Sequence, residues 1–129
     1  MSETDWSDLL DRFVVSALDD HPSFRRQVGR GGYVYRLDSG EGRTVEIGHS
    51  IAHRWLYLDA WEAHGVGDLE DLEYDLELYV RVALWYLNGH ISPPEQLDER
   101  DSRRSWPWRR KARRTWVLED CPLQLRQRR

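Results

Sequence analysis

The chain has 129 residues, 40% of them hydrophobic, one cysteine and a formal net charge of −4. This length is enough for one domain with a modest core, and the lone Cys121 excludes an internal disulfide and favours a reducing compartment. No apolar run approaches the ~20 residues of a membrane-spanning helix, so we expect a cytoplasmic protein without a membrane span.

The formal charge changes sign near residue 100. Residues 1–99 contain 8 Arg and no Lys against 20 acidic residues, which gives −12, whereas residues 100–129 carry +8. We therefore predict an acidic α+β body over residues 1–91, a proline-containing linker over 92–99 and a basic tail over 100–129. Such segregation indicates that the tail has an anionic target.

Residues 2–20 are predicted to form an amphipathic helix, because apolar side chains recur there at helical spacing. The helix should end before Pro22, since the residue that precedes a proline avoids helical angles. Residues 23–32, rich in glycine and arginine, read as a connector.

Residues 33–37 and 43–48 are predicted to form a β-hairpin around the glycine-containing turn at 38–42. A two-stranded ribbon is only marginally stable in water. The ribbon must therefore pack on helices or gain a third strand, which residues 24–28 or residues 115–118 could provide.

Two further helices are expected, over residues 50–64 and 68–88, with the break between them at Gly65 and Gly67. The predicted fold class is therefore α+β: three helices packed on a β-hairpin with a possible third strand, followed by a basic tail rich in tryptophan and arginine.

The helix over residues 68–88 carries two features that suggest partners. A second apolar stripe, opposite the core stripe, needs a cover, either from the chain itself or from a second copy in a homodimer. This stripe consists of Tyr74, Leu78, Val82 and Trp85. The first half of the helix is acidic and could imitate a phosphate backbone, as in an inhibitor or antitoxin-like protein that occupies a basic site: Asp68, Glu70, Asp71, Glu73, Asp75 and Glu77.

The basic tail supports the leading hypothesis, a small non-enzymatic interaction protein that engages nucleic acid or a nucleoprotein complex. Guanidinium groups neutralise phosphates and indole rings stack on unpaired bases. The residues expected to do so are Arg103, Arg104, Trp106, Trp108, Arg109, Arg110, Lys111, Arg113, Arg114 and Trp116. Docking of the tail on the acidic body, an anionic membrane surface and an acidic protein partner remain open alternatives.

Catalysis and metal binding have little support in the sequence. His49 and His53 stand at the i,i+4 spacing that can share a metal ion on a helix, but the glutamate of a zinc-hydrolase motif is absent. On that same helix His64 would lie ~16 Å further along the axis and could not join them. We expect no cofactor and no enzymatic activity, and an enzyme with a histidine-based metal site is the third possibility.

Overall fold

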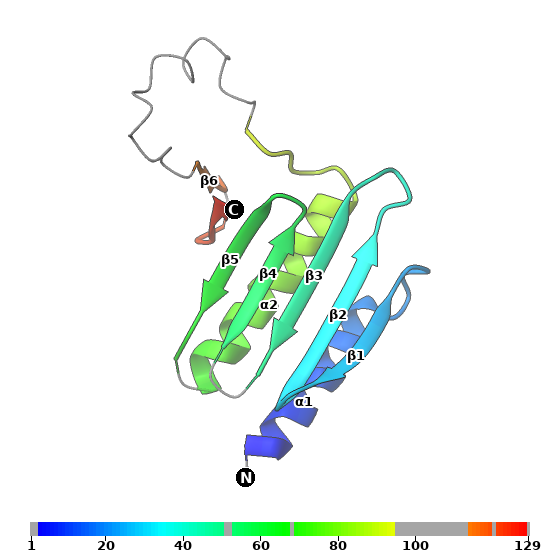
Figure 1. Cartoon of the computed structure of the whole chain (residues 1–129), viewed down its shortest axis with the longest axis vertical. Coiled ribbons are helices and arrows are strands. Elements are labelled where there is room, and N and C mark those ends of the chain that lie inside the picture. The colour runs from blue at the N-terminus through cyan, green and yellow to red at the C-terminus, as the bar shows by residue number, and fades with distance from the viewer. Residues whose placement is uncertain (1–2, 51–52, 68, 95–113, 120, 129) are drawn as a thin grey trace.

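The computed structural model describes residues 3–50, 53–67, 69–94, 114–119 and 121–128. Within them, two helices pack on one face of a seven-stranded antiparallel sheet with the strand order β1-β2-β3-β4-β5-β7-β6 (Figure 1). The elements are α1 (Glu3–Leu18), β1 (Arg25–Gly29), β2 (Gly32–Asp38), β3 (Thr44–His49), β4 (Arg54–Leu58), β5 (Trp61–Gly65), α2 (Leu69–Leu87), β6 (Thr115–Val117) and β7 (Gln124–Gln127).

The prediction of three helices on a hairpin is therefore wrong. The expected helix over residues 50–64 is replaced by the antiparallel strands β4 and β5. Side chains of β4 alternate strictly, with Leu56 and Leu58 fully buried and Trp55 and Tyr57 half-buried on the other face. This period of two is the pattern of a half-buried strand, and it outweighs the weaker helical spacing of the same apolar residues.

The turn between β4 and β5 is held by contacts from distant parts of the chain. Asp59 adopts a positive φ of 51°, a conformation that aspartate tolerates better than most residues. Its carboxylate accepts hydrogen bonds from the Thr44 hydroxyl at 2.7 Å and from the Tyr86 hydroxyl. These two contacts tie the turn to β3 and to α2.

The other predicted elements agree better with the structure. The first helix, the hairpin over residues 33–48 and the long acidic helix are present as α1, β2–β3 and α2. Both candidate third strands also lie in the sheet, residues 25–29 as β1 beside β2 and residues 115–117 as β6 beside β7. The connector over residues 23–32 is thus mostly strand and tight turn.

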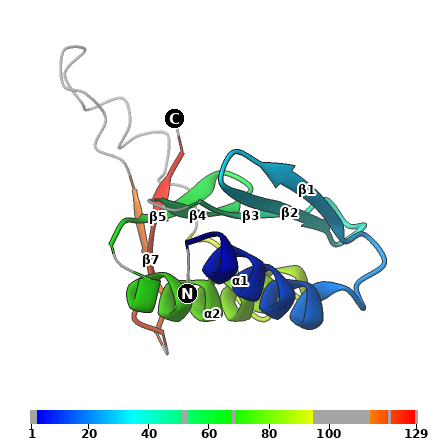
Figure 2. The same ribbon diagram turned by 90° about the horizontal axis from the view of Figure 1, so that it is seen from below.

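Both helices lie against the same face of the sheet (Figure 2), and the core fills the space between the two layers. Leu56, Ile47 and Tyr35 from the sheet meet Val14 of α1 and Leu76 of α2, all of them almost fully buried. No helix in the described part of the chain is long and apolar enough to cross a membrane.

An ion pair joins α2 to the sheet. The Arg54 guanidinium, with a side chain only 4% exposed, donates from Nε to Asp75 Oδ2 at 2.8 Å, and its Nη2 lies 2.6 Å from the same oxygen. Gly65 leaves room for this pair, because a Cβ there would stand 2.5 Å from Arg54 Nε. A buried charge needs such a partner to stay in the interior.

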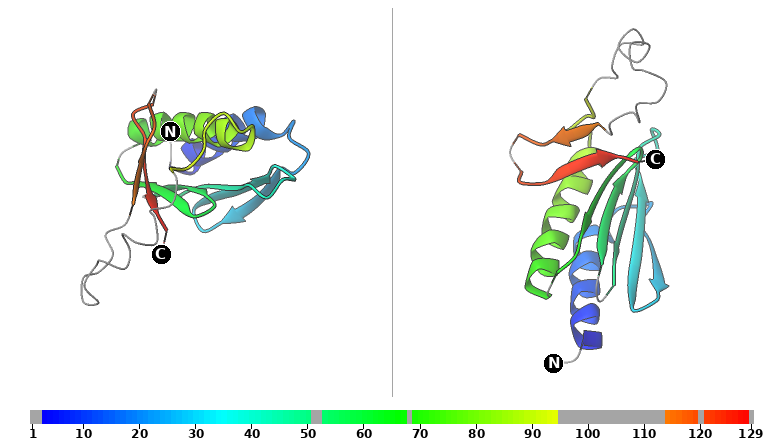
Figure 3. Two further views of the ribbon diagram at one scale, coloured as in Figure 1. Left: turned by 90° about the horizontal axis from the view of Figure 1, so that it is seen from above. Right: turned by 60° about the vertical axis from the view of Figure 1, so that its left-hand side comes forward.

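Strands β6 and β7, which lie within the predicted basic tail, form one edge of the sheet. β7 pairs with β5, and the hairpin extends beside α2 at that edge (Figure 3). Trp116 and Leu125 are buried, and the Trp116 ring meets the Trp61 ring edge-on at a centroid distance of 5.6 Å. This part of the tail therefore contributes to the core of the body.

Candidate functional site: the open face of the sheet

The candidate site is the face of the sheet that points away from both helices, which we call the open face (Figure 2). Successive residues of a strand point to opposite faces, so the buried positions fix which side chains lie outside. The open face carries Arg25, Gln27, Val34, Arg36, Glu46, Gly48, Trp55, Tyr57, Glu62, His64 and Arg126.

Four rings form a continuous cluster on this face, which we call the ring cluster: His53, Trp55, Tyr57 and His64. The His53 ring stacks on Trp55 at 5.3 Å between centroids, and Tyr57 meets His64 edge-on at 5.7 Å. His53 and His64 lie in nearly parallel planes, and their Nε2 and Nδ1 atoms are 2.9 Å apart. One of these nitrogens must donate a proton to the other, so the two imidazoles are fixed as a hydrogen-bonded pair.

Neighbouring residues hold the indole of Trp55 in place. Its Nε1 donates a hydrogen bond to Glu46 Oε2 at 2.9 Å, which orients the ring across the sheet. Gly48 lies directly beneath it, and a Cβ at that position would stand 1.9 Å from Trp55 Cζ2. The glycine thus lets the flat indole lie against the backbone of β3, as expected where a ring approaches a strand closely.

Arginines surround the ring cluster. Arg36 forms an ion pair with Glu46 at 2.9 Å, which offsets that carboxylate. The Arg128 guanidinium lies over the Tyr57 ring, 4.0 Å from its centroid. Arg25 and Arg126 are exposed in the same cross-strand row, Arg126 opposite Glu62. The row therefore carries arginines at both ends of the sheet, with Tyr57 between the carboxylates of Glu46 and Glu62 at its centre.

The environment keeps the His53 imidazole and the Tyr57 hydroxyl neutral near pH 7. Burial, the neighbouring His64 and the charge of Arg54 all lower the pKa of His53 below its usual value. Burial also raises the pKa of the Tyr57 hydroxyl, although Arg128 opposes this shift. His53, Trp55 and Tyr57 thus form an uncharged aromatic surface, which guanidinium groups and the carboxylates of Glu46 and Glu62 border.

A second polar cluster lies on the helix side of the sheet, in the interior. Arg26 donates from Nε and Nη2 to the two Asp11 oxygens at 2.7 and 2.6 Å. The Tyr35 hydroxyl lies 2.8 Å from Asp11 Oδ1 and 2.9 Å from His49 Nε2. Burial alone would raise the pKa of Asp11, but hydrogen bonds from Arg26 and Tyr35 lower it overall.

The donors and acceptors of this cluster follow from the ionised state of Asp11. An ionised Asp11 only accepts, so the Tyr35 hydroxyl donates to it and His49 Nε2–H must donate to Tyr35. His49 Nδ1 is then a buried acceptor that has no hydrogen-bond partner. Burial, opposed in part by Asp11, lowers the pKa of His49 to about 4.

His49 and His53 do not form the metal pair considered from the sequence. His49 points into the core beside Tyr35, whereas His53 lies on the open face beside His64. The strand turn brings His64 next to His53, although a helix would have kept them far apart. Among the described residues, no group of three or more His, Cys, Asp or Glu side chains is arranged to hold a metal ion.

The acidic half of α2 lies on the opposite side of the molecule from the open face. Of its predicted surface, Glu70, Asp71, Glu73 and Glu77 are exposed, while Asp75 turns inward to Arg54. Asp68 lies outside the described residues. The exposed carboxylates are therefore separated from the open face by the helix layer and the sheet.

The apolar stripe predicted to mediate a homodimer is largely covered by the chain itself. Leu78 and Val82 are only 7% and 0% exposed, and Trp85 is half-buried. Tyr74, at 57% exposure, is the member of the stripe that a partner would meet. The dimer through this stripe stays a prediction.

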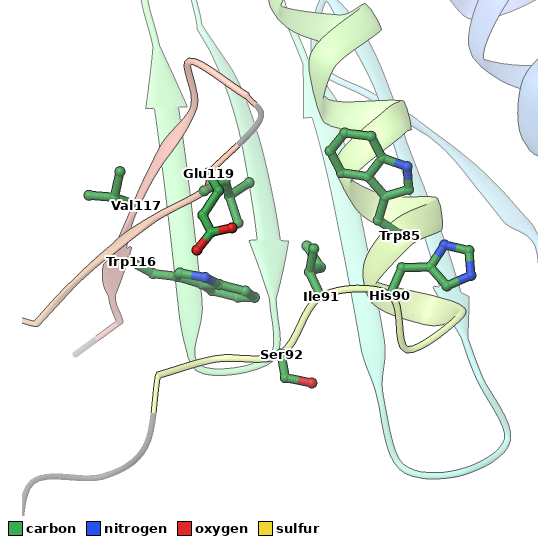
Figure 4. A pocket seen from close by; sticks show the side chains of 8 residues that line it. Trp85, His90, Ile91, Ser92, Trp116, Val117 and Glu119 are labelled. Atoms are coloured by element: carbon green, nitrogen blue, oxygen red, sulfur yellow. The ribbon is translucent and has the colours of Figure 1, made fainter.

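A groove of about 430 Å³ lies between the end of α2 and β6 (Figure 4). Trp85 and Ile91 line one part of it, and Trp116 and Glu119 line another. Arg43 holds the segment after α2 in place. Its guanidinium donates hydrogen bonds to the carbonyl oxygens of Tyr86 and Ile91 at 2.7 and 2.8 Å. The groove thus joins two tryptophans that the sequence assigned to different surfaces.

Most of the predicted nucleic-acid-binding residues fall outside the described part of the chain: Arg103, Arg104, Trp106, Trp108, Arg109, Arg110, Lys111 and Arg113. Arg114 is half-buried and Trp116 is buried against Trp61 and Tyr86. The sequence did not predict the ring cluster, because Trp55 was expected on a helix. The alternation over residues 54–58 was the signal that could have revealed it.

The structure therefore offers an aromatic and arginine-bearing sheet face, an acidic helix face and a small groove. Comparison of the chain with known protein families, curated proteins and solved structures found no match.

Proposed function

We propose that this protein is a small binding protein whose open face, together with the basic segment over residues 103–114, binds single-stranded nucleic acid. The observation that carries the proposal is the ring cluster bordered by Arg36, Arg126 and Arg128 on the sheet face that points away from both helices. Unpaired bases stack on such rings while guanidinium groups neutralise the phosphates, at ~1–3 kcal/mol per stacked base.

The layered fold supports this proposal by keeping the exposed carboxylates of α2 away from the open face. The exposed carboxylates of α2 would repel a polyanion at close range. A helix layer and the sheet, each roughly 10 Å thick, stand between those carboxylates and the open face. This separation exceeds the Debye length of ~8 Å at physiological salt, so the repulsion is largely screened there.

Substitution of the two half-buried rings on the open face tests the proposal. Trp55→Ala and Tyr57→Ala should each weaken binding of a fluorescent single-stranded oligonucleotide by about 5- to 150-fold, the equivalent of one stacked base. Fluorescence anisotropy at several salt concentrations measures the effect. Tyr74→Ala is the matched control, because Tyr74 is an exposed aromatic residue on the opposite layer. Equal affinities for all three variants would contradict the proposal.

We further propose that the protein acts in the cytoplasm as a binding protein rather than an enzyme. Cys121 is a free and buried thiol, a state that suits a reducing compartment. The histidines of the open face are occupied by their mutual hydrogen bond, which supports a role as a stacking surface.

A second candidate function rests on the acidic face of α2. Glu70, Glu73 and Glu77 are all exposed and follow one another at spacings of three and four residues, which places them on one side of the helix. A row of carboxylates of this kind can occupy the phosphate-binding site of a basic protein. The protein would then act as an inhibitor or antitoxin-like partner.

Charge reversal separates the two candidates. Glu70→Lys, Asp71→Lys and Glu73→Lys in combination should abolish capture of a basic partner from nuclease-treated extract of the native host. The same variant should keep or strengthen its affinity for single-stranded oligonucleotide. Capture that is unchanged by the triple substitution would exclude the acidic-face function.

A further inference from the structure

Strand β1 forms one edge of the sheet and offers unpaired backbone groups. Within the described part of the chain it pairs with β2 alone, and all five of its residues are exposed. Figure 1 shows no described element beyond it at this edge. An exposed edge strand is a template for another strand.

The pairing pattern identifies the backbone groups that point outward. The Ser39 N–H donates to the Arg43 carbonyl, so residues 33, 35 and 37 of β2 bond to β3, and residues 32, 34 and 36 bond to β1. Their partners in β1 are Gly29, Gln27 and Arg25. Because the bonding side alternates along a strand, the N–H and C=O groups of Arg26 and Val28 face away from the sheet.

The side chains of β1 are complementary to a second, antiparallel copy of the same strand. With Gln27 opposite Gln27 of the other copy, Arg26 faces Val28 and Arg25 faces Gly29. No arginine then stands directly opposite another arginine. The outward N–H and C=O groups of Arg26 and Val28 would pair with those of Val28 and Arg26 in the other copy.

We propose that β1 is a homodimer interface, in which two copies pair antiparallel about Gln27 to form one continuous sheet. The Arg26 guanidinium at this edge is neutralised by its ion pair with Asp11. Val28, 68% exposed, gains an apolar contact with the stem of Arg26 from the other copy. The opposite edge, β6, has only three residues, which favours β1 as the pairing strand.

This interface differs from the stripe on α2 and does not depend on nucleic-acid binding. The two open faces would lie side by side in the dimer, because the pairing continues the sheet without inverting it. A second copy is favoured over an unrelated strand because this register places Arg25 opposite Gly29 and Arg26 opposite Val28, so that no two arginines stand directly opposite each other.

Disulfide trapping tests the register. In a Cys121→Ser background, Gln27→Cys should form a cross-linked dimer on mild oxidation, because opposite residues of a non-hydrogen-bonded pair lie roughly 4.5 Å apart between Cα atoms. Arg25→Cys is the matched control on the same strand and face. Its two copies would be roughly 14 Å apart and should not cross-link. Equal cross-linking of both variants, or of neither, would overturn the proposal.

Self-association without cross-links gives an independent test. Analytical ultracentrifugation from micromolar to near-millimolar concentration should reveal a dimer of the native chain. Val28→Pro removes an outward N–H, a change that an edge strand tolerates, and should leave a monomer with an unchanged circular dichroism spectrum. Val28→Thr keeps the N–H and should keep the dimer. A native chain that stays monomeric, or a dimer that survives Val28→Pro, would overturn the proposal.

Discussion

Gly32→Ala should destabilise the fold by at least about 3 kcal/mol, the upper end of the usual cost of overpacking. A Cβ at this position would lie 1.8 Å from the His49 carbonyl oxygen and 2.9 Å from Ser50 Cα. Both contacts are with backbone, which cannot rotate away as a side chain can. Urea unfolding, followed by tryptophan fluorescence, measures the loss.

Gly29→Ala is the matched control, because Gly29 pairs with Gly32 across the same tight turn. There a Cβ would meet nothing closer than 3.8 Å. The φ of Gly29 lies outside the positive region, so alanine fits there without strain. The substitution should leave the stability unchanged or raise it by about 0.4–1 kcal/mol, because alanine lowers the conformational entropy of the unfolded chain. Similar losses for the two variants would contradict the pairing of β1, β2 and β3 described above.

The stability of the protein should fall steeply as the pH drops from about 6.5 to about 4. His49 is almost fully buried and its pKa is lowered to about 4, whereas in the unfolded chain its pKa is near the ordinary value of 6.5. Between these two pKa values the unfolded chain binds a proton on His49, whereas the folded protein does not. The stability is complete above pH 6.5 and decreases by about 3 kcal/mol by pH 4 from this group alone.

Thermal unfolding across this pH range, compared between the native chain and His49→Gln, isolates the contribution of His49. The variant should show a flatter profile, because glutamine does not titrate. Some slope should remain, since the lowered pKa of His53 acts in the same direction. An identical slope in both proteins would contradict a buried, neutral His49.

The sequence indicated those parts of the fold in which local pattern and tertiary contacts agree. Val14 and Leu18 of α1 and Leu72 and Leu76 of α2 follow the helical period and are buried as it predicts. The turn at residues 38–42 carries the glycines that its positive φ angles require at Gly40 and Gly42. In the two helices and in this turn, the local sequence pattern was enough to predict the structure.

The strands β4 and β5 were harder to predict from the sequence, because the turn between them contains no glycine to mark it. Asp59 is fixed there by Thr44 and Tyr86, which lie far away in the sequence. Ser50 and Gly65 resembled helix caps, and the spacing of Trp55 and Leu58 also fitted a helix. Contacts between residues distant in the sequence therefore favour two strands over a helix in this segment.

The same error hid the candidate site. On a helix His53 and His64 would be distant, whereas the strand turn sets their ring nitrogens 2.9 Å apart. The charge pattern predicted a basic tail beyond residue 100, but it did not indicate that Trp116 and Leu125 belong to the core. Composition identifies a basic segment, and only the fold shows which of its residues are buried.

Photo-cross-linking of a single-stranded oligonucleotide that carries photoreactive bases tests the central claim most directly. Peptide mapping of the cross-linked protein should find the attachment sites at Trp55 and Tyr57 and in the basic segment over residues 103–114. Sites confined to the basic segment, or located on α2 at Tyr74, would show that the open face of the sheet is not the binding surface.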